Sequence, residues 1–178
     1  MIKQFDDCSL RPFGLDDIEK KIEWINNPEN NAFLHYDIPL EYEKTLNWFK
    51  NKDNSKRLDC VIEYKSCPVG VIGLLAIDYT SKKAEYYITL GSTEHKRMGI
   101  ATKATMMILE YAFVDLNLNK IYLTVDADNI AACNLYESTG FVCEGNFAED
   151  QERRGQLVDR KRYAYLKKNW NYGWRKNG

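Results

Sequence analysis

A short segment in the middle of the chain holds residues whose types and spacing could bind an anion: YYITLGSTEHKRMGIAT, from Tyr86 to Thr102. It reads as a strand that ends at Gly91, a polar turn, and the first turn of a helix. A helix N-terminus exposes unpaired N–H groups and the positive end of the helix dipole, so it attracts phosphate. Gly99 lacks a Cβ and Ala101 has a minimal one, which leaves the backbone amides open to a ligand. The sequence therefore predicts a diphosphate-binding loop.

The predicted loop differs from two well-known phosphate-binding motifs. The chain contains neither G-x-x-x-x-G-K-[ST] nor G-x-G-x-x-G, which excludes a P-loop and a dinucleotide fingerprint. The remaining pattern is K-x-x-G-x-A, in which Lys96 and the adjacent Arg97 add positive charge beside the amides. The expected diphosphate contacts are Lys96, Arg97, Met98, Gly99, Ile100, Ala101 and Thr102.

Length, charge and cysteine usage limit the classes of protein that this chain can belong to. Its 178 residues suit a single domain, 1–178, and a hydrophobic fraction of 44% is ordinary for a globular protein. The formal charge of -1 argues against partners such as nucleic acid or an anionic membrane. Five cysteines without metal-type spacing indicate neither a metal site nor a disulfide framework. With no signal peptide and no apolar run long enough to span a membrane, we expect a cytoplasmic protein.

Hydrophobic periodicity predicts an α/β (α+β) fold: a mixed, mostly antiparallel sheet of six to seven strands with helices on both faces. The helices expected near residues 100 and 130 each follow a strand, so their N-termini open toward one cleft. Asn129 suits the N-cap of the second of these helices, and Gly140 suits its C-terminal end. The expected helices are 16–25, 41–50, 100–116 and 130–139, and the expected strands are 8–13, 58–64, 69–77, 84–90, 120–125, 141–145 and 161–166.

Two motifs together carry a family resemblance. HKRMGIATKA and NIAACNLYESTGF resemble the acyl-CoA-binding motifs of the Gcn5-related N-acetyltransferase (GNAT) superfamily, which follow [Q/R]-x-x-G-x-[G/A] and N-x-x-A-x-x-L-Y-E-x-x-G-F. The first motif departs from the pattern at Lys96, which keeps the positive charge but lacks the planar fork of arginine. The segment from Glu144 to Trp170 is similar to the ribosomal-protein, polyamine and amino-sugar acetyltransferase branches.

The resemblance implies an N-acetyltransferase that uses acetyl-CoA, needs no metal and has a splayed pair of central strands. An acetyl group would pass to a primary amine by direct attack in a ternary complex. The acceptor would be a small molecule such as a polyamine or an amino sugar, or a protein N-terminus. The alternative is a non-catalytic acyl-CoA-binding or regulatory module.

The resemblance also assigns residues to the reaction. Tyr136 would be the general acid, because a phenol is protonated at neutral pH and can give its proton to a leaving thiolate. The retention of this tyrosine argues against the non-catalytic alternative. The pantetheine arm would run along Thr89, Leu90 and Gly91, with Asn129 on its other side. Asn134 is a further expected cofactor contact.

The sequence leaves the general base and the acceptor open. Glu85 and Tyr87 share one face of the central strand and could relay a proton through water, with Glu85 as the candidate base. His35, Tyr36 and Asp37 follow the first predicted helix, where the resemblance places the acceptor site, and His35 is the other candidate for the base. A water chain without a dedicated side chain is the alternative base. We expect a small-molecule amine or peptide amine as partner, and a homodimer is left open.

Overall fold

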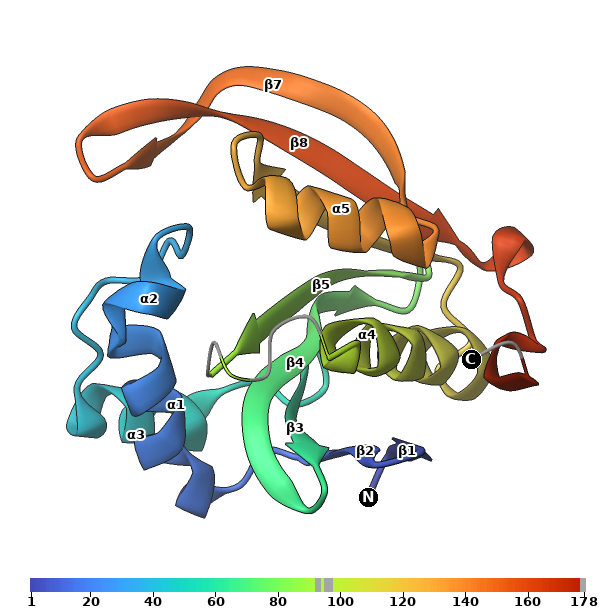
Figure 1. Ribbon diagram of the computed structural model, residues 1–178, viewed down its shortest axis with the longest axis horizontal. Coiled ribbons are helices and arrows are strands. Elements are labelled where there is room, and N and C mark those ends of the chain that lie inside the picture. The colour runs from blue at the N-terminus through green and yellow to red at the C-terminus, as the bar shows by residue number, and fades with distance from the viewer. Residues whose placement is uncertain (92–93, 95–97, 177–178) are drawn as a thin grey trace.

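The computed structural model of the chain describes residues 1–91, 94 and 98–176, so the predicted contacts Lys96 and Arg97 lie outside the described residues. One sheet of eight strands runs through this part of the chain in the order β1-β2-β3-β4-β5-β6-β8-β7 (Figure 1). The strands are β1 (Lys3–Phe5), β2 (Cys8–Pro12), β3 (Leu58–Tyr64), β4 (Cys67–Asp78), β5 (Lys83–Leu90), β6 (Lys120–Asp126), β7 (Val142–Arg153) and β8 (Gln156–Leu166). The helices are α1 (Ile18–Asn26), α2 (Pro28–Asn31), α3 (Tyr42–Asn51), α4 (Ile100–Glu110) and α5 (Ile130–Thr139). A π-helical segment follows at Tyr111–Asp115, and short 3-10 turns lie at Leu15–Asp17, Lys167–Asn169 and Trp174–Lys176.

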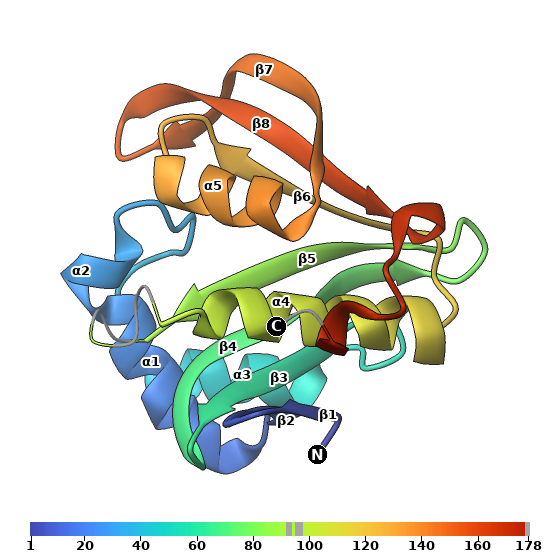
Figure 2. The same ribbon diagram turned by 45° about the vertical axis from the view of Figure 1, so that its right-hand side comes forward.

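Helices cover both faces of the sheet, as the periodicity predicts. Figure 2 shows α4 in front of the sheet and α3 behind it. The face toward α4 carries the main core, in which Leu10, Ile72 and Met107 are fully buried. A smaller cluster fills the opposite face, where Ile18 and Trp24 of α1 pack near Val61 and Val71. The sheet is therefore buried on both sides where its central strands lie.

The central strands β5 and β6 are the pair that diverges. They are parallel, and they pair only where Lys83–Glu85 face Lys120–Tyr122. Beyond that point β5 continues to Leu90 beside β4 alone, whereas β6 continues to Asp126 beside β8 alone. The predicted splay of the central strands is confirmed, and it leaves one backbone edge of β5 without a neighbouring strand.

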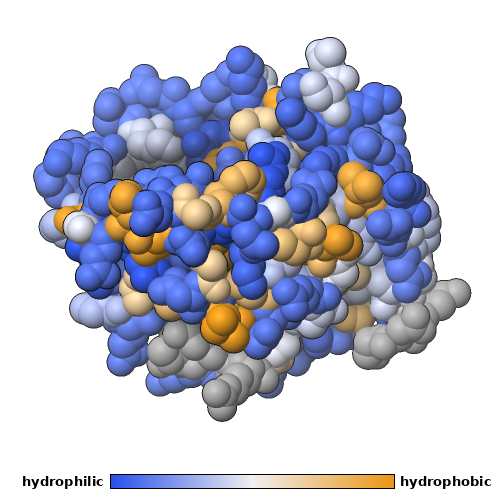
Figure 3. Space-filling model, turned by 90° about the horizontal axis from the view of Figure 1, so that it is seen from above, coloured by the Kyte–Doolittle hydropathy of each residue, from blue (hydrophilic) through white to orange (hydrophobic). Residues whose placement is uncertain are grey.

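The predicted strand count of six to seven is wrong, because β1 adds an eighth strand of only three residues. The four-residue helix α2 is likewise too short to show a period. The last two strands form a hairpin that is much longer than predicted. The prediction missed this length because β7 is exposed along nearly its whole length and carries few apolar residues. Figure 3 shows this upper face as mainly hydrophilic, with apolar residues scattered across it. Periodicity detects a buried face, and this hairpin has little of one.

A buried carboxylate ties β5 to β3 and α3. The side chain of Asp59 is fully buried and accepts hydrogen bonds from Lys52 Nζ (2.9 Å), Arg57 Nη2 (2.8 Å) and Tyr87 Oη (2.7 Å). Burial alone would raise its pKa, but the bonds from Arg57, Tyr87 and Lys52 outweigh burial and lower the pKa of Asp59 to about 2. The ordinary pKa of an aspartate is about 3.9, so this carboxylate stabilises the fold by roughly 2 kcal/mol above pH 5.

We expect Asp59→Asn to lower the free energy of unfolding by roughly 3 kcal/mol at pH 7, because it leaves buried cations without their partner. The folded-state pKa lies below the unfolded one, so the stabilisation is lost as pH falls from about 5 toward 2, and about half is gone by pH 3. Urea unfolding of the two proteins at pH 7 and pH 3 measures this gap. A gap that is equal at both values would contradict the assignment.

Candidate active site

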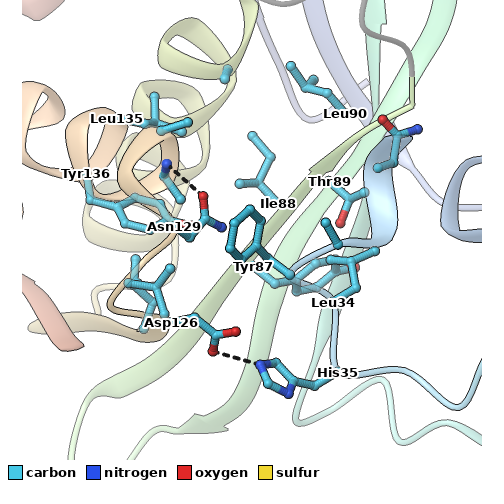
Figure 4. Close-up of a pocket in the computed structure, with 18 of the residues that line it drawn as sticks. Leu34, His35, Tyr87, Ile88, Thr89, Leu90, Asp126, Asn129, Leu135 and Tyr136 are labelled. Carbon is cyan, nitrogen blue, oxygen red and sulfur yellow. Dashed lines mark hydrogen bonds and ion pairs between the residues drawn. The ribbon is translucent and has the colours of Figure 1, made fainter. Parts of the chain in front are cut away.

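A cavity of about 660 Å³ opens where β5 and β6 diverge. Its walls come from the segment after α1, from the open edge of β5, from the end of β6 and from the start of α5 (Figure 4). The labelled side chains in Figure 4 converge on this space from elements that are far apart in the sequence. The predicted site residues that line it are His35, Tyr87, Thr89, Leu90, Ala101, Asn129 and Tyr136.

Tyr136 reaches into the cavity from α5. Only 7% of the residue is exposed, and its ring packs against the rings of Tyr86 (6.0 Å), Phe141 (5.8 Å) and Tyr163 (5.9 Å). Burial, with a smaller effect from Cys133, raises the pKa of Tyr136 well above its ordinary value. The phenol is therefore protonated at neutral pH and can act as a proton donor toward the cavity.

The open edge of β5 lies opposite this tyrosine. Thr89 and Leu90 line the cavity, as predicted for residues along an extended ligand. Gly91 does not: its N–H donates to the Val69 carbonyl (2.8 Å), and its own carbonyl accepts from Asn30 Nδ2 (2.8 Å). A Cβ at this glycine would collide with the Trp24 ring. Gly91 therefore provides close packing rather than free backbone groups.

The start of α4 has the features expected of an anion site. Gly99 is the N-cap, with φ of 74°, and a Cβ there would have no heavy atom within 4 Å. The carbonyl of Gly99 accepts from Lys103 N (3.0 Å), so the amides of Ile100, Ala101 and Thr102 belong to the first turn, where helices leave N–H groups unpaired. Ala101 faces the cavity, whereas the Ile100 side chain is buried in the core. The exposed Met98 precedes the cap.

The two asparagines of the second motif lie in different surroundings. Asn129 lines the cavity and caps α5, because its Oδ1 accepts from Ala132 N (3.2 Å). Its side-chain NH₂ makes no other hydrogen bond within the described residues, which leaves a donor for a ligand. Asn134 is exposed on α5 and is not part of the cavity wall. The structure therefore brings only Asn129 to the cavity.

The residues predicted as base or as acceptor contacts do not all lie in the same cavity. Glu85 is half-buried between Leu75 and Tyr122 and lines neither cavity. Tyr87 faces the first cavity, but its hydroxyl is committed to Asp59. A second cavity, of about 420 Å³, contains Tyr36 and Asp37 in its wall, and His35 lines both cavities.

Several residues at the site were not assigned individual roles from the sequence. Asp126 lies at the end of β6, is 2% exposed, and contacts His35 Nε2 through Oδ1 (2.8 Å). Arg153 of the long hairpin reaches the other oxygen of the same carboxylate (2.6 Å). Asn30 fixes α2 against Gly91. The position of Asp126, at a strand end just before the second motif, is the one feature that could have indicated it.

No group of three or more metal-ligating side chains occurs in the described part of the chain. In the same residues, no helix has the length and apolar character needed to cross a membrane. The open β5 edge, the start of α4 at Gly99 and the side chain of Asn129 together fit the extended arm and diphosphate of acetyl-CoA as substrate.

Comparison with known proteins supports this geometry. A model of the acetyltransferase (GNAT) domain matches residues 8–142. Spermidine N(1)-acetyltransferase of Vibrio cholerae is 34% identical over 145 residues, which is 80% of this chain and 83% of that protein. The Escherichia coli K12 spermidine N(1)-acetyltransferase is 31% identical over 153 residues, or 83% of this chain and 79% of that protein.

A solved structure agrees with the sequence comparisons. The crystal structure of spermidine N-acetyltransferase from Vibrio cholerae in complex with CoA and spermine superimposes with a TM-score of 0.83 at 28% identity, covering 91% of this chain and 96% of that one. The family model spans well over half of the sequence and contains both predicted motifs up to Phe141. The chain therefore belongs to the GNAT acetyltransferase family and is an N-acetyltransferase that uses acetyl-CoA.

Proposed function

We propose that this enzyme acetylates a primary amine of a polyamine. The main observation in support is a pair of carboxylates in the wall of the second cavity. Asp37 and Glu152 both line this cavity. Neither makes an ion pair within the described residues. Arg153 is already bound to the carboxylates of Asp126 (2.6 Å) and Asp128 (2.8 Å), and Arg154 donates to the carbonyl and side-chain oxygens of Asn31. Carboxylates that lack a cation attract the ammonium groups of a polyamine.

The path between the cavities also suits an extended cation. The walls of the two cavities share Leu34 and His35, so the cavities are adjacent. One end of a polyamine would enter the first cavity while a second ammonium group stays at the carboxylates. The similarity to spermidine N-acetyltransferases, one of them solved with CoA and spermine, supports this acceptor class.

Different residues of the first cavity would bind acetyl-CoA, polarise its thioester and protonate the leaving thiolate. The backbone edge of β5 at Thr89 and Leu90 would hold the extended arm of the substrate, and the first amides of α4 would bind its diphosphate. An N–H group on that edge would polarise the thioester carbonyl. Tyr136 would protonate the thiolate as the C–S bond breaks.

The acceptor proposal predicts a ranking among amines. Wild-type enzyme should release CoA from acetyl-CoA fastest with spermidine or spermine, and much more slowly with an amino-sugar nucleotide or a peptide with a free N-terminus. Thiol release measured against this panel checks the ranking. Turnover confined to the nucleotide or the peptide would exclude a polyamine acceptor.

Asp37→Asn should raise the KM for spermidine roughly fivefold and leave the KM for acetyl-CoA unchanged, because one ion pair in partial contact with water contributes about 1 kcal/mol. The effect should shrink at high salt. Asp7→Asn is the matched control, since Asp7 lies in the turn between β1 and β2, away from both cavities. Equal KM values in the two variants would remove Asp37 from the acceptor site.

Tyr136→Phe should reduce kcat by about 10²-fold, the usual effect of removing a general acid. Its affinity for acetyl-CoA, measured by calorimetry, should change less than threefold, because the ring still fills the same space. Tyr79→Phe removes a hydroxyl from a residue that is 55% exposed and outside both cavities, so it is the control. Full activity in Tyr136→Phe would rule out this tyrosine as the acid.

A further inference from the structure

The proposed acetylation starts from an ammonium group, which must lose a proton before its nitrogen can attack a thioester. We propose that the Nδ1 atom of His35 accepts this proton, directly or through one water molecule. The inference rests on the proposed function, since it requires an acceptor that is charged at neutral pH. It assigns a role that the sequence left between Glu85, a water chain and the residues after the first helix.

His35 lies where the two cavities adjoin. It is one of two residues shared by the walls of both cavities, and the other, Leu34, has no titratable group. His35 therefore lies where the cavity with the acidic residues adjoins the cavity with Tyr136. An amine that moves from the carboxylates toward the thioester passes the imidazole.

The hydrogen bonding of the ring also supports this role. Figure 4 shows His35 bound to Asp126, with Nε2 2.8 Å from Oδ1. A carboxylate can only accept, so Nε2 carries the hydrogen. The neutral ring then has its lone pair on Nδ1, which makes no hydrogen bond within the described residues, and 27% of the side chain is exposed. The buried carboxylate thus fixes the tautomer in which Nδ1 can accept a proton.

The other titratable groups of the first cavity are committed elsewhere. Both oxygens of Asp126 accept hydrogen bonds, from His35 and from Arg153. Tyr87 donates to Asp59, and the Tyr86 hydroxyl is 2.8 Å from Thr105 Oγ1. Glu29 has an interaction of its own. Tyr136 is assigned as the acid, so among the other described titratable residues of this cavity His35 is the one with an acceptor atom that has no hydrogen-bond partner.

The proton balance is complete with these groups. His35 takes one proton from the ammonium group and becomes an imidazolium beside Asp126. The freed lone pair forms the C–N bond, the C–S bond breaks, and Tyr136 gives its proton to the thiolate sulfur. The second proton of the attacking nitrogen returns to Tyr136 through water, and His35 releases its proton to solvent through the exposed side of the ring. The products are the acetamide, CoA thiol and one released proton.

The charged groups around the imidazole come from several elements. Asp126 of β6 contacts it directly, Arg153 of β7 shares that carboxylate, and Arg160 of β8 lies 3.9 Å from the same Oδ1. Asp128 binds Arg153 from the other side. Tyr36 and Asp37 follow His35 in the same segment, and Glu152 and Arg154 line the second cavity beside it.

The test compares wild type with His35→Gln, whose amide can still donate to Asp126 and keep the loop in place. We expect kcat/KM for spermidine to fall at least thirtyfold at pH 7 and the difference to shrink as pH rises toward 10, because free amine then becomes abundant. The kcat/KM of the variant should instead rise continuously with pH, following the fraction of free amine. Acetyl-CoA affinity by calorimetry should stay within twofold.

A weakly basic acceptor separates proton removal from a structural role. With a fluorinated diamine that is neutral at pH 7, His35→Gln should lose less than threefold in kcat/KM. An equal loss with spermidine and with the fluorinated diamine would overturn the inference, as would a variant that keeps the wild-type pH profile. If wild type ignores polyamines but acetylates another amine, the proposed function fails, and the same comparison on that amine and a weakly basic analogue then decides the role of His35.

Discussion

The divergence of β5 from β6 is the constraint on which the rest of the structure depends. Parallel strands that pair for only three residues on each side leave backbone groups on β5 that no other strand satisfies. The polar groups of such an edge need a partner, which a ligand or water can provide. The cavity, the start of α4 and the N-cap of α5 all meet at this edge. The divergence of the two strands therefore produces the substrate site.

Asp126 holds the other side of the opening together. It ends β6, and its two oxygens receive hydrogen bonds from the segment after α2 and from the long β7–β8 hairpin. Arg154 of the hairpin adds a second link, to the carbonyl and side-chain oxygens of Asn31. Segments more than 100 residues apart in the chain are thereby fixed against each other at the acceptor side. A buried carboxylate with several donors is expected to be rigid, which suits a residue that orients an imidazole.

Much of the fold could be predicted because its central elements have one or two buried faces. The periodicity of α4 and α5 and the continuous β-formers of β6 indicate these elements directly. The β7–β8 hairpin could not be predicted in full, because solvent-exposed strands leave no apolar alternation. The short β1 and α2 contain too few residues for any period, and yet α2 carries Asn30, which contacts Gly91.

The site, like the fold, has parts that the sequence predicts and parts that it does not. Tyr136, Asn129, Thr89, Leu90 and Ala101 follow from motifs that occupy continuous segments, and the structure brings them together. Asn134 and Gly91 belong to the same motifs but do not line the cavity, since a helix presents only part of its residues to one side and the glycine supports packing against Trp24. Contacts such as His35 with Asp126 join distant segments, and local sequence contains no information on them.

Hydrogen–deuterium exchange with and without CoA tests the central claim that the open edge of β5 binds the substrate. The account predicts added protection, on CoA binding, at the amides of β5 from Tyr87 to Leu90 and in the first turn of α4. Strand β3, which is paired on both sides, should show no comparable change. Unchanged exchange along β5 and α4, with CoA shown by calorimetry to be bound, would contradict the account.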